Sequence, residues 1–214
     1  AVMFHHFHGR KFFKSQGSIS SKQFDSILLY LKKNYNLLDA HDYLKKIENN
    51  EIKKKDVCLT FDDCLKSQYE IAYPVMRKHN ITGFFFIYSG AFDRRNNFEI
   101  YREFRNTMYK KIDDFYDDFF YTLKNIMAKK FLEFNLKFNK KYLSNYKFYS
   151  LNDRKFRFCR DQILSEKNYE KVMSKIMIAK KFNIIKNKKK LFMRLNDLKT
   201  LNQRKNIIGL HSDS

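Results

Sequence analysis

The sequence predicts an α/β protein built on a parallel sheet, with a long, mostly helical segment set into it. Residues 57–61 and 81–87 have the apolar, β-branched and aromatic composition of buried strands, and a helix-like stretch at 65–79 joins them. A strand, a helix and a strand in about 30 residues form a βαβ unit, whose strands are parallel. We expect a further strand of the same sheet at residues 207–210.

The middle of the chain, residues 96–183, contains neither proline nor glycine. Apolar residues recur there at three- and four-residue steps from Ile112 to Ile126, which predicts an amphipathic helix. A second helix is expected from about Ser165 to Phe182. We interpret residues 96–183 as a helical insertion. Two roles stay open for it, a cap over a functional site or a cover that only buries sheet surface.

Two adjacent carboxylates, Asp62 and Asp63, directly follow the strand predicted at 57–61. Like charges side by side are costly unless a cation or a proton lies between them. The carboxyl end of a strand is also where α/β proteins usually place their chemistry. The pair therefore predicts a metal site or an acid–base pair. The alternative is a helix N-cap followed by a first-turn acid, because a helix is expected to begin at Leu65.

The charge balance is strongly basic, with 44 Lys and Arg against 23 Asp and Glu and a net charge of +21. A basic chain can bind nucleic acid, an anionic membrane or an acidic glycan. The densest run, residues 180–205, is interpreted as a solvated face, as charge runs usually are. No known nucleic-acid-binding motif accompanies it, so no nucleic-acid partner is expected. The alternative function is a non-catalytic basic helical module that binds an anionic polymer, either glycan or nucleic acid.

Three cysteines, Cys58, Cys64 and Cys159, form no CxxC pair and do not indicate a disulfide framework. No apolar run reaches the roughly 18 residues of a membrane span, so no transmembrane segment is expected. No signal peptide is visible and we expect a cytoplasmic protein. An N-terminal signal stays an open alternative, because the chain opens on Ala1 inside an apparent strand. The sequence does not indicate an oligomeric state.

Several of these segments resemble the polysaccharide deacetylases, which are carbohydrate esterase family 4, also called the nodulation-protein-B (NodB) homology domain. The first family motif is Thr-Phe-Asp-Asp-Gly and the second is His-Ser/Thr-x-x-His. The matching segments here are Leu59-Thr60-Phe61-Asp62-Asp63, Pro74-Val75-Met76, Thr82-Gly83-Phe84-Phe85, Ile208-Gly209-Leu210-His211-Ser212 and the N-terminal Val2-Met3-Phe4-His5-His6-Phe7.

The resemblance extends over roughly residues 1–92 and 154–214. It implies an incomplete, distorted (β/α) barrel with a long, mostly helical insertion. On this interpretation residues 1–214 are a single deacetylase-like domain that is incomplete at its C-terminus, and residues 96–183 are inserted within it.

The resemblance also implies a metal-dependent hydrolase that acts on a non-peptide carbon–nitrogen bond and removes acetyl groups from an N-acetylated sugar or polysaccharide. It implies Asp62 as the catalytic general base, with Asp63 and His211 as metal ligands. The implied cofactor is a divalent metal, with zinc expected, which lowers the pKa of a bound water to about 7 and polarises a carbonyl. The implied partner is an N-acetylated glycan.

The chain departs from the family pattern in three ways. Cys64 stands where the family has glycine, and we expect it to be a steric substitute rather than a metal ligand. The second histidine of the second motif would fall one position past Ser214, and the later motifs have no counterpart. Residues 1–214 then offer two of the three protein ligands of a typical catalytic zinc. We expect weak metal binding and little or no deacetylase activity from them alone.

Three histidines near the N-terminus, His5, His6 and His8, form another possible cluster. Neighbouring residues on a strand point to opposite faces, so at most one of His5 and His6 is expected to reach the site. His8 lies beyond the apparent strand end. A lone histidine at such a position is more often a hydrogen-bonded structural residue than a ligand.

Overall fold

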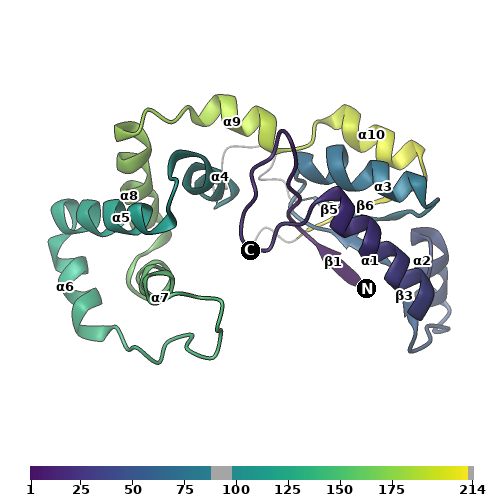
Figure 1. Ribbon diagram of the computed structural model, residues 1–214, viewed down its shortest axis with the longest axis horizontal. Helices are drawn as coiled ribbons and strands as arrows, with labels where there is room; N and C mark the ends of the chain where they lie inside the picture. The colour runs from purple at the N-terminus through teal and green to yellow at the C-terminus, as the bar shows by residue number, and fades with distance from the viewer. Residues whose placement is uncertain (88–97, 212–214) are drawn as a thin grey trace. The chain divides into compact units, whose positions relative to one another are not determined.

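The computed structural model describes residues 1–87 and 98–211, which divide into two compact units (Figure 1). The first unit is formed by the described residues of Ala1–Ile100 and Ile185–Ser214, and the second by Tyr101–Ile184. The expected start of the helical insertion, residues 96 and 97, lies outside the described residues.

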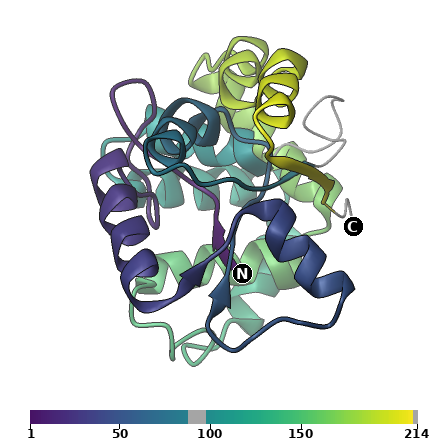
Figure 2. The same ribbon diagram turned by 90° about the vertical axis from the view of Figure 1, so that its right-hand side faces the viewer.

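A parallel sheet with strand order β1-β4-β5-β6 forms the centre of the first unit (Figures 1 and 2). Its strands are β1 (Val2–Phe4), β4 (Leu59–Phe61), β5 (Gly83–Ile87) and β6 (Ile207–Leu210). All three ladders between them are parallel, with Phe4 opposite Phe61. The predicted α/β class and parallel sheet are confirmed, and closure into a barrel stays a prediction.

The strand predicted at 57–61 is divided at Cys58. Val57 belongs to β3 (Asp56–Val57), which pairs with β2 (Asn36–Leu37) in a separate two-stranded sheet. The reason is the buried Asp56 carboxylate, which accepts hydrogen bonds from the Asn36 amide at 2.7 Å and the Lys46 ammonium at 2.9 Å. These bonds hold the pKa of Asp56 down at about 2.

The helix predicted at 65–79 is shorter and begins irregularly. A π-helical turn, η1 (Gln68–Ala72), continues into α3 (Tyr73–Lys78). Pro74 lies in the first turn of α3, where its missing N–H is tolerated. The following strand begins at Gly83, because residues 79–82 form the turn that leads out of α3.

One face of the sheet packs against α1 (Ser21–Asn34), α3 and α10 (Leu195–Gln203) (Figure 1). The buried side chains of this core include Phe24 and Leu28 from α1, Met76 from α3, Leu201 from α10, and Phe61 and Phe85 from the strands. Ser20 begins α1 with a capping box to Gln23, as its sequence favours. On the other face α2 (Ala40–Glu48) contributes Ala40 against Cys58 and Phe84.

Gly83 permits the close approach of α3 to the sheet. A Cβ atom there would lie 3.0 Å from the Leu59 carbonyl oxygen and 3.1 Å from the Met76 methyl carbon. Both distances are tighter than ordinary carbon contacts, so a larger residue would push the helix away from the strands. The chain therefore needs a glycine at the start of β5.

The second unit is helical and has its own aromatic core. It contains α5 (Ile112–Ile126), α6 (Ala128–Lys137), α7 (Leu151–Phe158), the π-helical η3 (Cys159–Ile163) and α8 (Glu166–Ala179), and most of α4 (Phe98–Met108). Its fully buried rings include Phe104, Phe115, Phe119 and Phe156. The helix predicted from Ile112 to Ile126 is confirmed. The second predicted helix is confirmed with Ser165 as its N-cap and an earlier end at Ala179.

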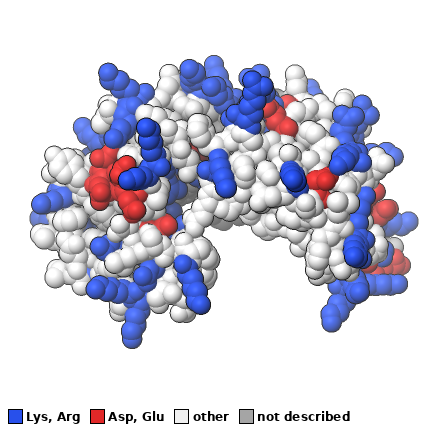
Figure 3. Space-filling view, viewed as in Figure 1, with Lys and Arg blue, Asp and Glu red and all other residues white. Residues whose placement is uncertain are grey.

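Basic side chains are scattered over the face shown in Figure 3 rather than gathered in one continuous patch. The densest basic run continues through α9 (Ile184–Leu191), which buries none of its side chains, in line with the predicted solvated face. Among the described residues, no helix is both long enough and apolar enough to cross a membrane.

Candidate active site

The residues singled out in the sequence meet at the carboxyl edge of the parallel sheet. His5 follows the end of β1, Asp62 and Asp63 follow the end of β4, and His211 follows the end of β6. The backbone N–H of Asp62 donates to the Phe4 carbonyl at 3.2 Å. The N–H of His211 donates to the Ile87 carbonyl at 2.7 Å. These bonds extend the ladders by one residue and bring the strand ends together.

Asp62 is buried, with 5% of its surface exposed, and its carboxylate lies between two imidazoles. One of its oxygens, Oδ2, is 3.8 Å from His5 Nε2 and 3.7 Å from His211 Nε2. The other, Oδ1, is fully buried and has no hydrogen-bond partner among the described residues. An unpaired buried carboxylate oxygen is costly, so this atom is suited to a water, a substrate proton or a cation.

Asp63 belongs to a second group of ligand-type side chains. The donor atoms of His6, Asp63 and Glu99 all lie within 4.8 Å of one another. His6 Nε2 and Glu99 Oε2 are hydrogen-bonded at 2.8 Å. Burial raises the pKa of the Asp63 carboxyl, and the negative charge of Glu99 raises it further, while His5, His6 and His211 act in the opposite direction.

The backbone turns sharply after the aspartate pair. Asp63 and Cys64 both have left-handed conformations, with φ of 75° and 56°. The left-handed conformation costs a non-glycine residue on the order of 1 kcal/mol of free energy. Residues in this conformation are common at functional sites. The Cys64 side chain is buried in the core against the helices. Burial also raises the pKa of its thiol to about 12, so it stays protonated and is a poor ligand.

This turn is held by the segment that leads into α10. The Met193 N–H donates to the Cys64 carbonyl at 2.9 Å, and Leu65 pairs with Phe192 in an antiparallel bridge. The Lys66 ammonium lies 2.5 Å from an Asp197 carboxylate oxygen. The alternative role of the aspartate pair as a helix cap is not supported, because Ser67 precedes η1 and Asp62 Oδ1 accepts no hydrogen bond among the described residues.

Gln68 forms hydrogen bonds to both loops of the site, the one after β1 and the one after β4. Its side chain is fully buried, and its amide nitrogen donates to the His5 carbonyl at 2.9 Å and to the Asp62 carbonyl. It comes from the π-helical turn η1, a feature that is frequent at functional sites. The Gln68 amide therefore adds to the backbone bond between Asp62 and Phe4 in fixing the position of Asp62 relative to His5.

We expect Gln68→Met to destabilise the protein by about 1–3 kcal/mol, because the volume is kept but buried carbonyls lose their donor. Urea unfolding measures the change. Gln203→Met, at an exposed position on α10, is the matched control and should change the stability by less than about 0.5 kcal/mol. Equal stability of the two variants would mean that the Gln68 amide does not hold the loops together.

The expectation that at most one of His5 and His6 reaches the site is wrong. β1 ends at Phe4, so the alternation of a strand does not extend to these residues. Their rings are stacked, with centroids 6.0 Å apart and planes 12° apart, and each faces a different aspartate. His8 has a structural partner instead, since its Nδ1 is hydrogen-bonded to Ser18 Oγ at 3.0 Å.

The donor chemistry of the site fits a divalent cation. Imidazole nitrogens together with carboxylate oxygens suit zinc and the neighbouring first-row metals. Asp63 and Glu99 provide carboxylates, and His6 and His211 provide imidazoles at the same edge of the sheet. Glu99 was missed in the sequence, because an acid in the first turn of α4 looks like an ordinary helix-dipole partner.

Two pockets of the first unit differ in whether they contain residues of the candidate site. One of about 600 Å³ is mostly apolar and is lined by Met3, Thr60, Phe84, Phe86 and Leu210 together with Asp62 and His211. It lies on the face of the sheet opposite α1 and α3. This pocket reaches Asp62, so it offers a substrate a way to the candidate base.

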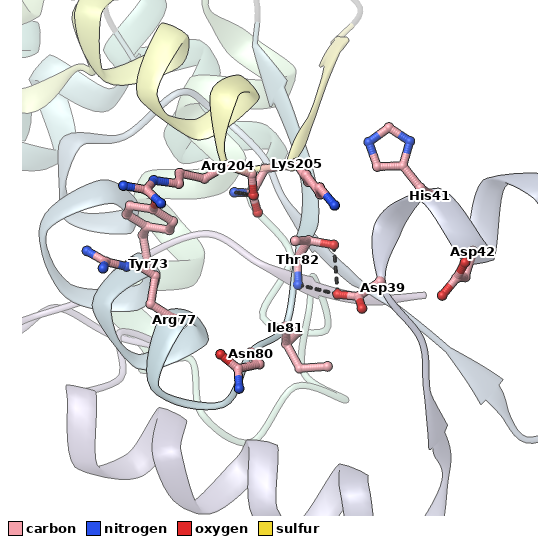
Figure 4. A pocket seen from close by; sticks show the side chains of 11 residues that line it. Asp39, His41, Asp42, Tyr73, Arg77, Asn80, Ile81, Thr82, Arg204 and Lys205 are labelled. Atoms are coloured by element: carbon pink, nitrogen blue, oxygen red, sulfur yellow. Dashed lines mark hydrogen bonds between the residues drawn. The ribbon is translucent and has the colours of Figure 1, made fainter.

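The other pocket, of about 910 Å³, lies at the amino-terminal edge of the sheet (Figure 4). Three of its polar side chains, Asp39, Thr82 and Asn206, form hydrogen bonds that hold the fold. Asp39 Oδ1 accepts from the Thr82 backbone N–H at 2.8 Å and from the Thr82 hydroxyl at 2.9 Å. The Asn206 amide oxygen accepts from the Gly83 N–H at 3.0 Å. This pocket is separate from the aspartate pair, which lies at the opposite edge.

The comparisons with known proteins agree with the sequence motif. Residues 49–116 match the family model described as polysaccharide deacetylase. Through this segment the chain is similar to the polysaccharide deacetylases. The resemblance found in the sequence is thereby confirmed, and the matched deacetylase segment contains the aspartate pair, Gln68 and Glu99.

A curated relative of the deacetylase segment is the poly-beta-1,6-N-acetyl-D-glucosamine N-deacetylase of Staphylococcus aureus strain MSSA476. It is 31% identical over 80 residues, which cover 37% of this chain and 28% of the relative. The same enzyme from strain COL is 31% identical over 80 residues, which cover 37% of this chain and 27% of the relative. The chain thus spans less than a third of the length of these relatives.

The solved structures that resemble the chain include IcaB from Ammonifex degensii, with 26% identity and a TM-score of 0.35 over 40% of this chain and 36% of that one. Another is the Streptococcus pyogenes deacetylase PplD in complex with acetate, with 25% identity and a TM-score of 0.35 over 44% of each chain.

Proposed function

We propose that the protein is a metal-dependent hydrolase that removes acetyl groups from N-acetylglucosamine units of a polysaccharide. The observation that carries the proposal is the buried Asp62 carboxylate, which has one unpaired oxygen and lies between His5 and His211 next to Asp63. The family match of residues 49–116 and the names of the curated relatives support the same reaction class and substrate.

Hydrolysis of an N-acetyl group breaks the carbon–nitrogen bond, adds the elements of water, and releases acetate and an amine. In this proposal Asp62 is the general base that takes a proton from the attacking water. Its unpaired Oδ1 can receive that proton without breaking a hydrogen bond to another described residue. Burial keeps competing bulk water away from the carboxylate.

Asp63 and His211 are proposed as ligands of a divalent cation, with zinc as the expected metal. Such a cation supplies a polarised acetyl carbonyl and a water of lowered pKa. Asp63 stays ionised when positive charge lies beside it, which leaves Asp62 free to exchange a proton. The two adjacent carboxylates then have different roles, set by their surroundings.

The amine needs a proton as it leaves, and we assign this step to His5. Its side chain is 41% exposed and its Nε2 is 3.8 Å from Asp62 Oδ2. It can therefore contact a substrate on one side and the base on the other. Imidazole is the side chain best suited to give a proton near neutral pH.

We further propose that residues 1–214 belong to one deacetylase-like domain whose sheet is part of a distorted (β/α) barrel, with residues 96–183 inserted within it. Four parallel strands with their chemistry at the carboxyl edge support this architecture. The second unit, Tyr101–Ile184, interrupts the first unit in the sequence, as an insertion does.

The test is acetate release from N-acetylglucosamine oligomers. The longest natural form of the protein should release acetate, a chelator should abolish the release, and Zn²⁺ or Co²⁺ should restore it. Residues 1–214 alone should show little or no turnover, because the oxyanion donor of the family has no counterpart in them. Turnover that persists in the chelator would overturn the metal dependence, and robust turnover by residues 1–214 would overturn the need for the missing motifs.

A further inference from the structure

We propose that His6, Asp63 and Glu99 together bind a divalent cation, so that Glu99 on α4 is a metal ligand of this protein. The inference rests on the proposed function only through Asp63, which the two sets of ligands share. It assigns the cation two further donors: His6, which the sequence offers only as part of a possible histidine cluster, and Glu99, which no motif in the sequence indicates.

The three donors are close enough that small side-chain movements would let them bind one ion. Their ligand atoms lie within 4.8 Å of one another. A zinc-like ion with bonds of about 2 Å holds its ligand atoms roughly 3–3.5 Å apart, which small side-chain rotations reach from here. His6 Nε2 and Glu99 Oε2, at 2.8 Å, already share a hydrogen bond that a cation would replace.

The fold assembles this group from three distant segments. His6 follows β1, Asp63 follows β4, and Glu99 lies in the first turn of α4. The His6 carbonyl accepts a hydrogen bond from the Ile19 N–H at 3.1 Å, which fixes the loop that carries the imidazole. The Asp63 backbone is held in the left-handed region, a cost that persists only where the surrounding structure enforces it.

The charge and chemistry of the donors indicate the class of ion. Two carboxylates and a neutral imidazole carry a formal charge of −2, which a divalent cation neutralises. The imidazole favours zinc, cobalt, iron(II) or manganese over the oxygen-loving calcium and magnesium. Three protein donors with room for a further ligand is the arrangement of catalytic zinc sites.

A consequence is that residues 1–214 suffice to bind the ion. In the sequence alone, only Asp63 and His211 were available, and weak binding was expected. Asp63 together with His6 and Glu99 supplies the three protein donors that a catalytic zinc normally uses, even without His211. Metal binding by residues 1–214 then does not require the catalytic motifs that have no counterpart in them.

The experiment is a titration of metal-free residues 1–214 with Co²⁺ alone, followed by visible absorption and calorimetry. We expect one Co²⁺ per chain, with Glu99→Gln and His6→Gln each weakening the affinity by at least about ten-fold. Glu103→Gln, four residues further along α4, makes the same charge change and should leave the affinity within about two-fold of the wild type. Circular dichroism of the metal-free variants shows whether they are folded.

Each outcome decides between the inference and the proposed function. Wild-type affinity in Glu99→Gln and His6→Gln, with binding lost in Asp63→Asn and His211→Asn, overturns the inference and leaves the proposed function intact. Unchanged binding in Asp63→Asn overturns both. If Glu99→Gln fails to fold, Glu99→Asp keeps the charge but shortens the reach. An altered Co²⁺ spectrum in that variant supports ligation, and an unaltered spectrum contradicts it.

Discussion

Asp62→Asn in the longest natural form of the protein is expected to lower the rate of acetate release by about 10²–10⁴-fold, the typical contribution of a general base. The amide has nearly the same shape as the carboxylate but cannot take a proton from water. The neighbouring Asp63 is untouched, so bound metal, measured by elemental analysis, should stay at the wild-type level.

Asp63→Asn should also lose activity, but for a different reason. Its metal content should fall, whereas that of Asp62→Asn should stay at the wild-type level. The two variants are matched controls for each other, since each removes one negative charge at the same strand end. Wild-type turnover in both variants would place the active site elsewhere. Loss of metal from Asp62→Asn would show that this carboxylate is a ligand rather than the base.

Phe61→Ala is expected to destabilise the first unit by about 3–5 kcal/mol, the range for removing a buried aromatic side chain. Phe61 is fully buried at the centre of the sheet. Its ring stacks on Phe85 with centroids 4.6 Å apart, and it also contacts the rings of Phe4 and Phe24. Domains are stable by only about 5–15 kcal/mol, so a large part of the margin would be lost.

Urea unfolding measures this effect, and Phe13→Ala provides the control. Phe13 belongs to the same unit but is 59% exposed, so its truncation should cost less than about 0.5 kcal/mol. If Phe61→Ala is as stable as Phe13→Ala, the sheet and its helices do not form the core described above. The position also matters for function, because Asp62 is the next residue in the chain.

Much of the fold could be predicted because its patterns are local. The helix from Ile112 to Ile126 was predicted to its ends, since its apolar residues recur at a helical period over four turns. The strand at 207–210 was predicted from its apolar run. The division of 57–61 could not be predicted, because it depends on hydrogen bonds from Asn36 and Lys46 to Asp56, which are long-range contacts.

In the candidate site, too, local patterns could be predicted and long-range contacts could not. Asp62, Asp63 and His211 follow strands of one parallel sheet, so a sequence reader can expect them at one edge. His5 and His6 were assigned by strand alternation, which fails where the strand ends early. Glu99 approaches Asp63 only in the folded chain, and no local pattern distinguishes it from other acids in a first helical turn.

The most direct test of the central claim is to locate the cation by anomalous scattering from crystals of the protein grown with Zn²⁺. The account predicts a single strong peak about 2 Å from an Asp63 carboxylate oxygen, at the carboxyl edge of the sheet and beside the Asp62 carboxylate. A zinc-loaded, active protein whose peak lies away from Asp63 would contradict it.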